Sequence, residues 1–93
     1  MMTAKNVLYT GRVQGVGFRY STKRIASGFD VTGWVKNLPD GRVEMMAQAF
    51  EADELEAFLE DIQQSSLGSH IKGREVNAIA ADPNLRGFSI LRD

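Results

Sequence analysis

Cysteine is absent from this 93-residue sequence, and the only histidine is His70. The lack of cysteine excludes disulfide bonds, a thiolate nucleophile and cysteine-ligated zinc, and one histidine cannot form a histidine cluster around a metal. Long hydrophobic runs are missing too, since a membrane-spanning helix needs about 18 or more consecutive apolar residues. The first residues also lack the basic start followed by an apolar stretch that is typical of a secretory signal peptide. We therefore expect a cytoplasmic protein without a metal site, an export signal or a membrane span.

An excess of positive charge is also lacking, because 11 lysine and arginine residues face 12 aspartate and glutamate residues. Non-specific binding to nucleic acid or to an anionic membrane depends on a broad positive potential, so neither partner is expected. With 43% hydrophobic and 25% charged residues, the composition is that of a globular chain. Residues 1–93 suffice for one domain with a single core. An anionic substrate would need a local binding site.

The pattern of apolar residues predicts the element order strand, helix, strand, strand, helix, strand. The clearest element is a helix from Asp53 to Gln64, where apolar residues recur at the i, i+3, i+4, i+7 spacing and acidic residues occupy the first turn. An earlier helix follows a glycine-bearing loop at 14–17 and ends near Gly28. The predicted strands cover residues 5–13, 31–37, 42–50 and 71–80, with a short edge strand at 87–91.

This order is that of the split βαβ, or ferredoxin-like, α+β fold. In it, two right-handed crossovers place both helices on one face of an antiparallel sheet and leave the other face open. Enzymes, ligand-binding regulatory domains and RNA-binding domains share this architecture, so the fold alone does not select a function. The choice has to come from a site within the single domain.

A candidate anion site lies at residues 11–19, GRVQGVGFR, where a strand runs into the glycine-bearing loop and the first helix. Backbone N–H groups around a concavity, together with the unpaired amides of a first helical turn, bind anions without net positive charge. Arg19 adds a guanidinium that can donate two parallel hydrogen bonds to phosphate. The Walker A and dinucleotide-binding patterns are not met. From the loop alone, a tight turn before a solvated Arg19 is an equally good interpretation.

Two segments resemble the signatures of the acylphosphatase family: GRVQGVGFR at 11–19 and TGWVKN at 32–37. The length, the element order and the ending GFSI at 87–90 also resemble that family. The resemblance implies a hydrolase that cleaves the anhydride between a carboxyl or carbamoyl group and phosphate, without a metal or an organic cofactor. Its partner would be a small-molecule acyl phosphate, and inorganic phosphate or sulfate would compete for the site.

The resemblance also implies roles for individual residues. Arg19 and Asn37 are the catalytic pair, in which the arginine holds the phosphoryl group and the asparagine orients the attacking water. The loop that surrounds the phosphate with backbone donors consists of Gln14, Gly15, Val16, Gly17 and Phe18. Elementary chemistry agrees, because phosphoryl transfer needs mainly positioning and charge stabilisation, and an amide carbonyl can accept a hydrogen bond from water. A phosphate oxygen of the substrate then takes the proton.

Other conspicuous residues receive structural interpretations. His70 lies in a linker, far in sequence from both signatures. The acidic residues of 51–61 follow the polar face of a helix and are interpreted as a solvated face rather than a metal site. Met45 and Met46 point to opposite faces of their strand, so one of them is expected to fill the core. Trp34 either covers part of the open sheet face or borders the site.

Two other functions stay open. An RNA-binding domain of the same fold would stack bases on the open sheet face, but its aromatic signature and a basic charge are lacking. A module that binds carbamoyl phosphate or another phosphorylated metabolite without turnover would keep the anion pocket, and the sequence does not exclude it. We prefer the enzyme because both Arg19 and Asn37 are present, and we expect it to be a monomer.

Overall fold

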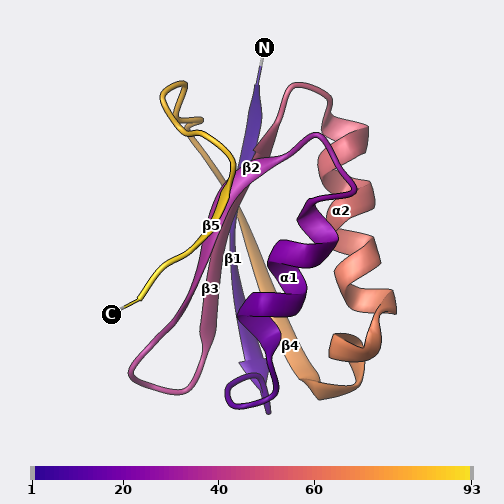
Figure 1. Ribbon diagram of the computed structural model, residues 1–93, viewed down its shortest axis with the longest axis vertical. Helices are drawn as coiled ribbons and strands as arrows, with labels where there is room; N and C mark the ends of the chain where they lie inside the picture. The colour runs from indigo at the N-terminus through magenta and orange to yellow at the C-terminus, as the bar shows by residue number, and fades with distance from the viewer. Residues whose placement is uncertain (1, 93) are drawn as a thin grey trace.

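The computed structural model describes residues 2–92 and contains one five-stranded sheet with two helices packed on one face (Figure 1). The strands are β1 (Thr3–Gly11), β2 (Thr32–Asn37), β3 (Val43–Ala49), β4 (Ile71–Ile79) and β5 (Phe88–Ile90). The helices are α1 (Phe18–Ala26) and α2 (Ala52–Gln64), and the short 3-10 helix η1 (Ser66–His70) precedes β4. The predicted element order and the ferredoxin-like α+β fold are confirmed.

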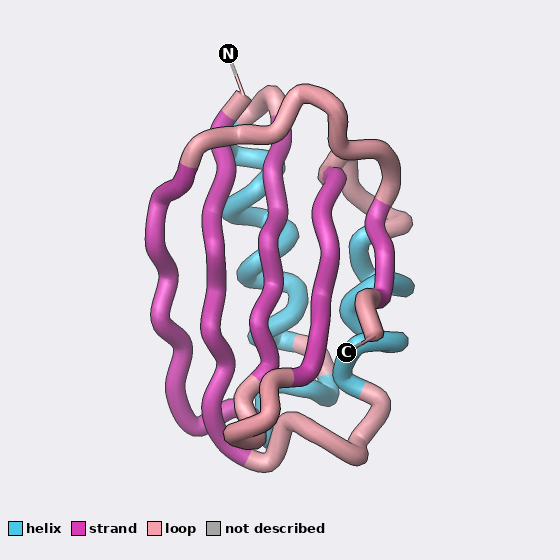
Figure 2. The backbone as a smooth tube through the Cα atoms, turned by 90° about the vertical axis from the view of Figure 1, so that its left-hand side faces the viewer, coloured by secondary structure: helices cyan, strands magenta, loops and turns pink. Residues whose placement is uncertain are grey.

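The strand order in the sheet is β4-β1-β3-β2-β5. β1 pairs antiparallel with both β3 and β4, and β2 pairs antiparallel with β3, as the two crossovers require. β5 runs parallel to β2 at the far edge from β4, so the sheet as a whole is mixed. The sequence predicted this edge strand but not its partner. Figure 2 shows the face without helices, with the segment after β4 crossing one end of the sheet toward β5.

The core lies between the sheet and the helices. Val7 and Tyr9 of β1 and Val35 of β2 are fully buried there. The predicted stripe of α2 is buried throughout, at Leu55, Phe58, Leu59 and Ile62. The ring of Phe58 meets the ring of Phe88 from β5 edge-on, with 5.7 Å between centroids. Burying such a side chain contributes about 1.5–3 kcal/mol, so α2 and β5 stabilise each other.

The first strand ends at Gly11 rather than at Val13, because its pairing with β4 shifts register between Thr10 and Gly11. Gly11 has a φ of 121°, and a Cβ atom there would clash with the carbonyl oxygen of His70. Arg12 donates its backbone N–H to the same oxygen at 3.0 Å. This close approach turns the chain out of the sheet and begins the loop that leads to α1.

Two side chains on the helix-free face of β3 are buried without belonging to the core. Met45 is part of the core between sheet and helices, whereas Met46 lies on the opposite face, as predicted. Trp34 is its cross-strand neighbour on β2. Further along the strand, the Gln48 side chain donates to the carbonyl of Asp82 and accepts from its N–H, both at 2.8 Å. The segment after β4 therefore covers this end of the open face.

Candidate active site

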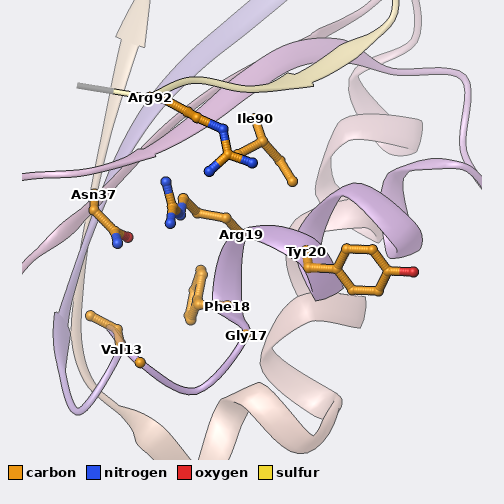
Figure 3. Close-up of a pocket in the computed structure, with 9 residues that line it drawn as sticks. Val13, Gly17, Phe18, Arg19, Tyr20, Asn37, Ile90 and Arg92 are labelled. Atoms are coloured by element: carbon orange, nitrogen blue, oxygen red, sulfur yellow. The ribbon is translucent and has the colours of Figure 1, made fainter.

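A pocket of about 200 Å³ opens where β2 and β5 end and the loop before α1 begins (Figure 3). Its lining comes from three separate parts of the chain: Val13, Gly15, Gly17, Phe18, Arg19, Tyr20, Asn37, Ile90 and Arg92. The β1–α1 connection supplies the first three of these residues and the first turn of α1 the next three. The end of β2 supplies the seventh, and the last part of the chain supplies the other two. The β1–α1–β2 crossover brings the first two parts together, and the parallel pairing of β5 with β2 adds the third.

The loop at the base of the pocket has alternating backbone conformations. Gly15 and Gly17 have φ values of 78° and 76°, whereas Val16 between them has a negative φ, because no described residue other than glycine is positive. Alternation of this kind is typical of an anion-binding nest, in which successive backbone N–H groups point toward one concave side. A Cβ atom at Gly15 or Gly17 would meet nothing within 4 Å, so glycine is needed here for its conformation alone.

The first amides of α1 have no side-chain cap among the described residues. Gly17 is the N-cap residue and offers no side chain, and the first turn contains no acidic residue. The first N–H groups of a helix lack intrahelical partners and carry the positive end of its dipole. An anion in the pocket can therefore accept hydrogen bonds from the nest and from the helix end together.

Arg19 lies in the first turn of α1 and is half-buried. Its Nη1 atom donates a long hydrogen bond, 3.4 Å, to the carbonyl oxygen of Leu91, which restrains the direction of the side chain. A guanidinium has five N–H donors, so most of them are left for a ligand. Figure 3 shows the group pointing into the pocket, on the same side as the amide of Asn37.

Phe18 fixes the start of α1 in the core. Its ring lies 5.0 Å from the ring of Tyr9, and both side chains are buried. The Tyr9 hydroxyl has no hydrogen-bond partner among the described residues. Burial raises the pKa of Tyr9 well above its usual range, and the charge of Arg74 opposes this shift only in part. The phenol therefore stays neutral, and the support beneath the pocket is apolar.

Asn37 occupies the last position of β2, paired with Val43 across the hairpin. The Gln14 side chain ties this hairpin to the loop, because its Nε2 donates to the carbonyls of Leu38 at 2.8 Å and Arg42 at 2.9 Å. One side chain thus ties the loop before α1 to the turn that follows Asn37. The position of Asn37 relative to the nest is set by these two bonds and by the sheet.

Most of the residues predicted for the site line this pocket, namely Gly15, Gly17, Phe18, Arg19 and Asn37. Gln14 and Val16 do not: the Gln14 side chain is bound to the hairpin, and Val16 packs against the core. Trp34 is also outside the lining, and its ring lies 5.3 Å from the Lys36 ammonium on the open sheet face. The alternative that Trp34 borders the site is not supported by this geometry.

Sequence reasoning missed four lining residues: Val13, Tyr20, Ile90 and Arg92. Arg92 is the most consequential of them, because it brings a second guanidinium. It was missed because its position depends on the parallel pairing of β5 with β2, which a strand pattern alone does not reveal. The signal that could have found it is the alternation of Phe88, Ile90 and Arg92, which places all three on one side of an extended chain.

The acidic residues of α2 were predicted to form a solvated face. Asp53, Glu56, Glu60 and Asp61 are exposed, in agreement with the predicted solvated face. Within residues 2–92, no group of three or more histidine, cysteine, aspartate or glutamate side chains is arranged to hold a metal ion. In the same range, no helix is long and apolar enough to cross a membrane.

Comparisons with known proteins agree with this architecture. A model of the acylphosphatase family matches residues 5–90. An acylphosphatase of Methylococcus capsulatus is 40% identical over 92 residues, which is 99% of each chain. Among solved structures, an acylphosphatase from Bacillus subtilis superposes with a TM-score of 0.86 at 35% identity, covering 99% of this chain and 100% of the other.

A second solved structure, an acylphosphatase from Coxiella burnetii, has a TM-score of 0.84 at 30% identity and covers 97% of this chain and 93% of its own. Family match, sequence identity and fold therefore coincide over nearly the whole chain. Every lining residue of the pocket except Arg92 lies inside the matched range. The chain belongs to the acylphosphatase family and is thus an enzyme of the acylphosphate-hydrolase class.

Proposed function

We propose that this chain hydrolyses the carboxyl–phosphate bond of an acyl phosphate in this pocket, with Arg19 and Asn37 as its catalytic residues. Membership of the family supports the reaction class. The observation that carries the assignment of residues is that Arg19, Asn37 and the two left-handed glycines share one small cavity. All of them come from a single chain, so the mechanism requires no second copy, and we expect a monomer.

The phosphoryl group lies against the nest in this proposal. Backbone N–H groups of residues 14–18 and the guanidinium of Arg19 donate hydrogen bonds to its non-bridging oxygens, on which charge is concentrated as the bond to the leaving group breaks. These donors are held in place before substrate arrives: the glycines fix the loop, Phe18 anchors the helix, and Gln14 ties the loop to the hairpin. Little reorganisation is then needed during the reaction.

The attacking water is held by Asn37. Its amide carbonyl accepts a hydrogen bond from the water and directs the water oxygen at phosphorus, opposite the departing carboxylate. A bond forms between this oxygen and phosphorus while the bond from phosphorus to the acyl oxygen breaks, and the carboxylate leaves with the electron pair. The water proton passes to a phosphate oxygen of the substrate. In this scheme, no metal or organic cofactor takes part in a step.

Hydrolysis of benzoyl phosphate in the presence of a chelator tests this proposal. Arg19→Ala and Asn37→Ala are each expected to lower kcat/KM by about 100- to 1,000-fold, because each removes a positioned group at the reacting centre. Arg86→Gln and Asn84→Ala are matched controls on the exposed 80–87 segment, outside the pocket, and should stay close to wild type. Circular dichroism verifies that all four variants fold. Wild-type rates in both pocket variants contradict the assignment.

Inorganic phosphate or sulfate should inhibit competitively, because each occupies the place of the phosphoryl group. We expect Arg19→Ala to weaken this inhibition and Arg86→Gln to leave it unchanged. Inhibition that does not depend on substrate concentration would place the anion elsewhere. Binding of carbamoyl phosphate without any turnover, by a protein that also fails to hydrolyse benzoyl phosphate, would favour the alternative of a binding module.

A further inference from the structure

Arg92 is a pocket residue to which the proposed hydrolysis assigns no role. It belongs to the segment that follows β5, and Figure 3 shows its guanidinium directed toward the pocket, as is that of Arg19. The strand register explains this placement. Val35 of β2 lies opposite Ile90 of β5, and the two strands are parallel. Two residues further along each extended chain, Asn37 and Arg92 therefore lie at the same end of the sheet. Both are on the side of the helices.

The pocket therefore gathers two positive charges, and no acidic side chain is among its described lining residues. The three ion pairs found within residues 2–92 involve neither Arg19 nor Arg92. Like charges in one small cavity repel each other, and a ligand with more than one anionic group relieves that repulsion best. The phosphoryl group already has the nest and Arg19 as partners, so Arg92 is left for a second anionic group.

The depth of each side chain indicates which end of the substrate meets Arg92. Phe18 is buried beneath the pocket, Arg19 is half-buried, and Arg92 is exposed at the rim. When the phosphoryl group lies against the nest, the acyl group is the end that extends outward. A guanidinium at that place is suited to a carboxylate, which it binds through two parallel hydrogen bonds.

We infer that Arg92 is a specificity-determining residue that selects acyl phosphates whose acyl group carries a second carboxylate. This inference rests on the proposed function, because the phosphoryl group has to occupy the nest before the acyl group can reach the rim. It narrows the substrate from acyl phosphates in general to monophosphorylated dicarboxylic acids. The reaction that supplies the substrate would accordingly be one that phosphorylates a single carboxyl group of a dicarboxylate.

Three substrates with one ring isolate the effect of the added charge: benzoyl phosphate, 3-carboxybenzoyl phosphate and 4-carboxybenzoyl phosphate. The rigid ring keeps the carboxylate from attacking its own anhydride, and the two isomers differ in reach. For wild type we expect kcat/KM to be about tenfold higher with one carboxy isomer than with benzoyl phosphate, chiefly through KM. In Arg92→Gln this preference should disappear, because kcat/KM should fall more for the carboxy substrate than for benzoyl phosphate.

Arg86→Gln is the matched control, because it removes an exposed arginine just before β5 that does not line the pocket. It should retain the preference for the carboxy substrate. An equal loss on all three substrates in Arg92→Gln would place the guanidinium on the phosphoryl group and overturn the inference. A wild type without preference for either isomer also overturns it. A wild type that hydrolyses none of the three contradicts the proposed function itself, so the two failures are distinguishable.

Discussion

The connection from β1 to α1 and the connection from β3 to α2 occupy equivalent places in the two halves of the fold, yet they differ in length and charge. The first spans residues 12–17 and contains two left-handed glycines, and the helix after it has no acidic residue in its first turn. The second spans only residues 50–51, and α2 begins with Asp53 and Glu54. Carboxylates of its own complement the dipole of α2, whereas the first turn of α1 supplies none, as the proposed anion site requires.

The two helices also differ in how they contribute to stability. Helix α2 has 13 residues and buries four large apolar side chains. Helix α1 has 9 residues and buries Phe18, Thr22 and Ala26, and the Thr22 hydroxyl has no partner among the described residues. The two crossovers of the fold, one with α1 and one with α2, thus have different tasks. The one with α2 holds the sheet, and we propose that the other presents an anion site.

The largest effect is expected from a substitution in α2, the helix that stabilises the sheet. Phe58→Ala should lower the free energy of unfolding by about 3–5 kcal/mol, because it opens a cavity next to Phe29 and Phe88. Urea denaturation measures this loss, and kcat of the folded fraction should remain near wild type. Asp61→Ala, on the exposed face of the same helix, is the control and should stay within about 0.5 kcal/mol. Loss of kcat without loss of stability would contradict the division of tasks.

A smaller effect is expected from the nest. Gly17→Ala should cost about 1–2 kcal/mol of stability, because alanine is strained at a φ of 76°. It should also weaken phosphate inhibition, since the N–H groups no longer converge. Gly28→Ala, just after the same helix, has no positive φ and meets only an ordinary contact at 3.5 Å, so it should be nearly neutral. Similar inhibition constants in the two variants would refute the role given to the nest.

The smallest effect is expected from placing a negative charge in the first turn of α1, where α2 already has such charges. Tyr20 lies in the first turn of α1 and is 68% exposed. Tyr20→Glu should raise the inhibition constant of phosphate about fivefold, or by about 1 kcal/mol, and added salt should reduce the difference. Glutamine has nearly the same shape as glutamate but no charge, so Tyr20→Gln should raise the inhibition constant of phosphate less. If both variants weaken phosphate equally, the effect comes from the lost ring rather than from charge.

Much of the fold follows from short-range pattern. The stripe of α2 has one spacing that buries all its apolar residues, and the whole stripe is buried as predicted. The opposed directions of Met45 and Met46 follow from the period of a strand. Asn37 could be placed at a strand end because a recognisable turn follows it. These inferences need only neighbours in sequence.

The missing parts of the site depend on contacts between distant segments. Arg92 enters the pocket because β5 pairs with β2 at one edge of the sheet. Nothing in the pattern of 87–91 indicates which edge of the sheet this strand joins. The side-chain position of Gln14 depends on backbone carbonyls at the far end of a hairpin, which have no sequence signature. A glycine-bearing loop before α1 was predictable from the sequence, whereas the loop alone did not decide between an anion site and a tight turn.

The parallel pairing of β5 with β2 has a consequence for the kinetics of folding. The pocket contains residues from the start, the middle and the end of the described chain, and the Leu91 N–H reaches the Val35 carbonyl at 2.9 Å only when that edge has formed. Contacts of such long sequence separation carry a high loop-closure cost and are among the slow steps of folding. During refolding, helical signals should therefore return before hydrolysis does, so the recovery of activity reports the arrival of the last strand.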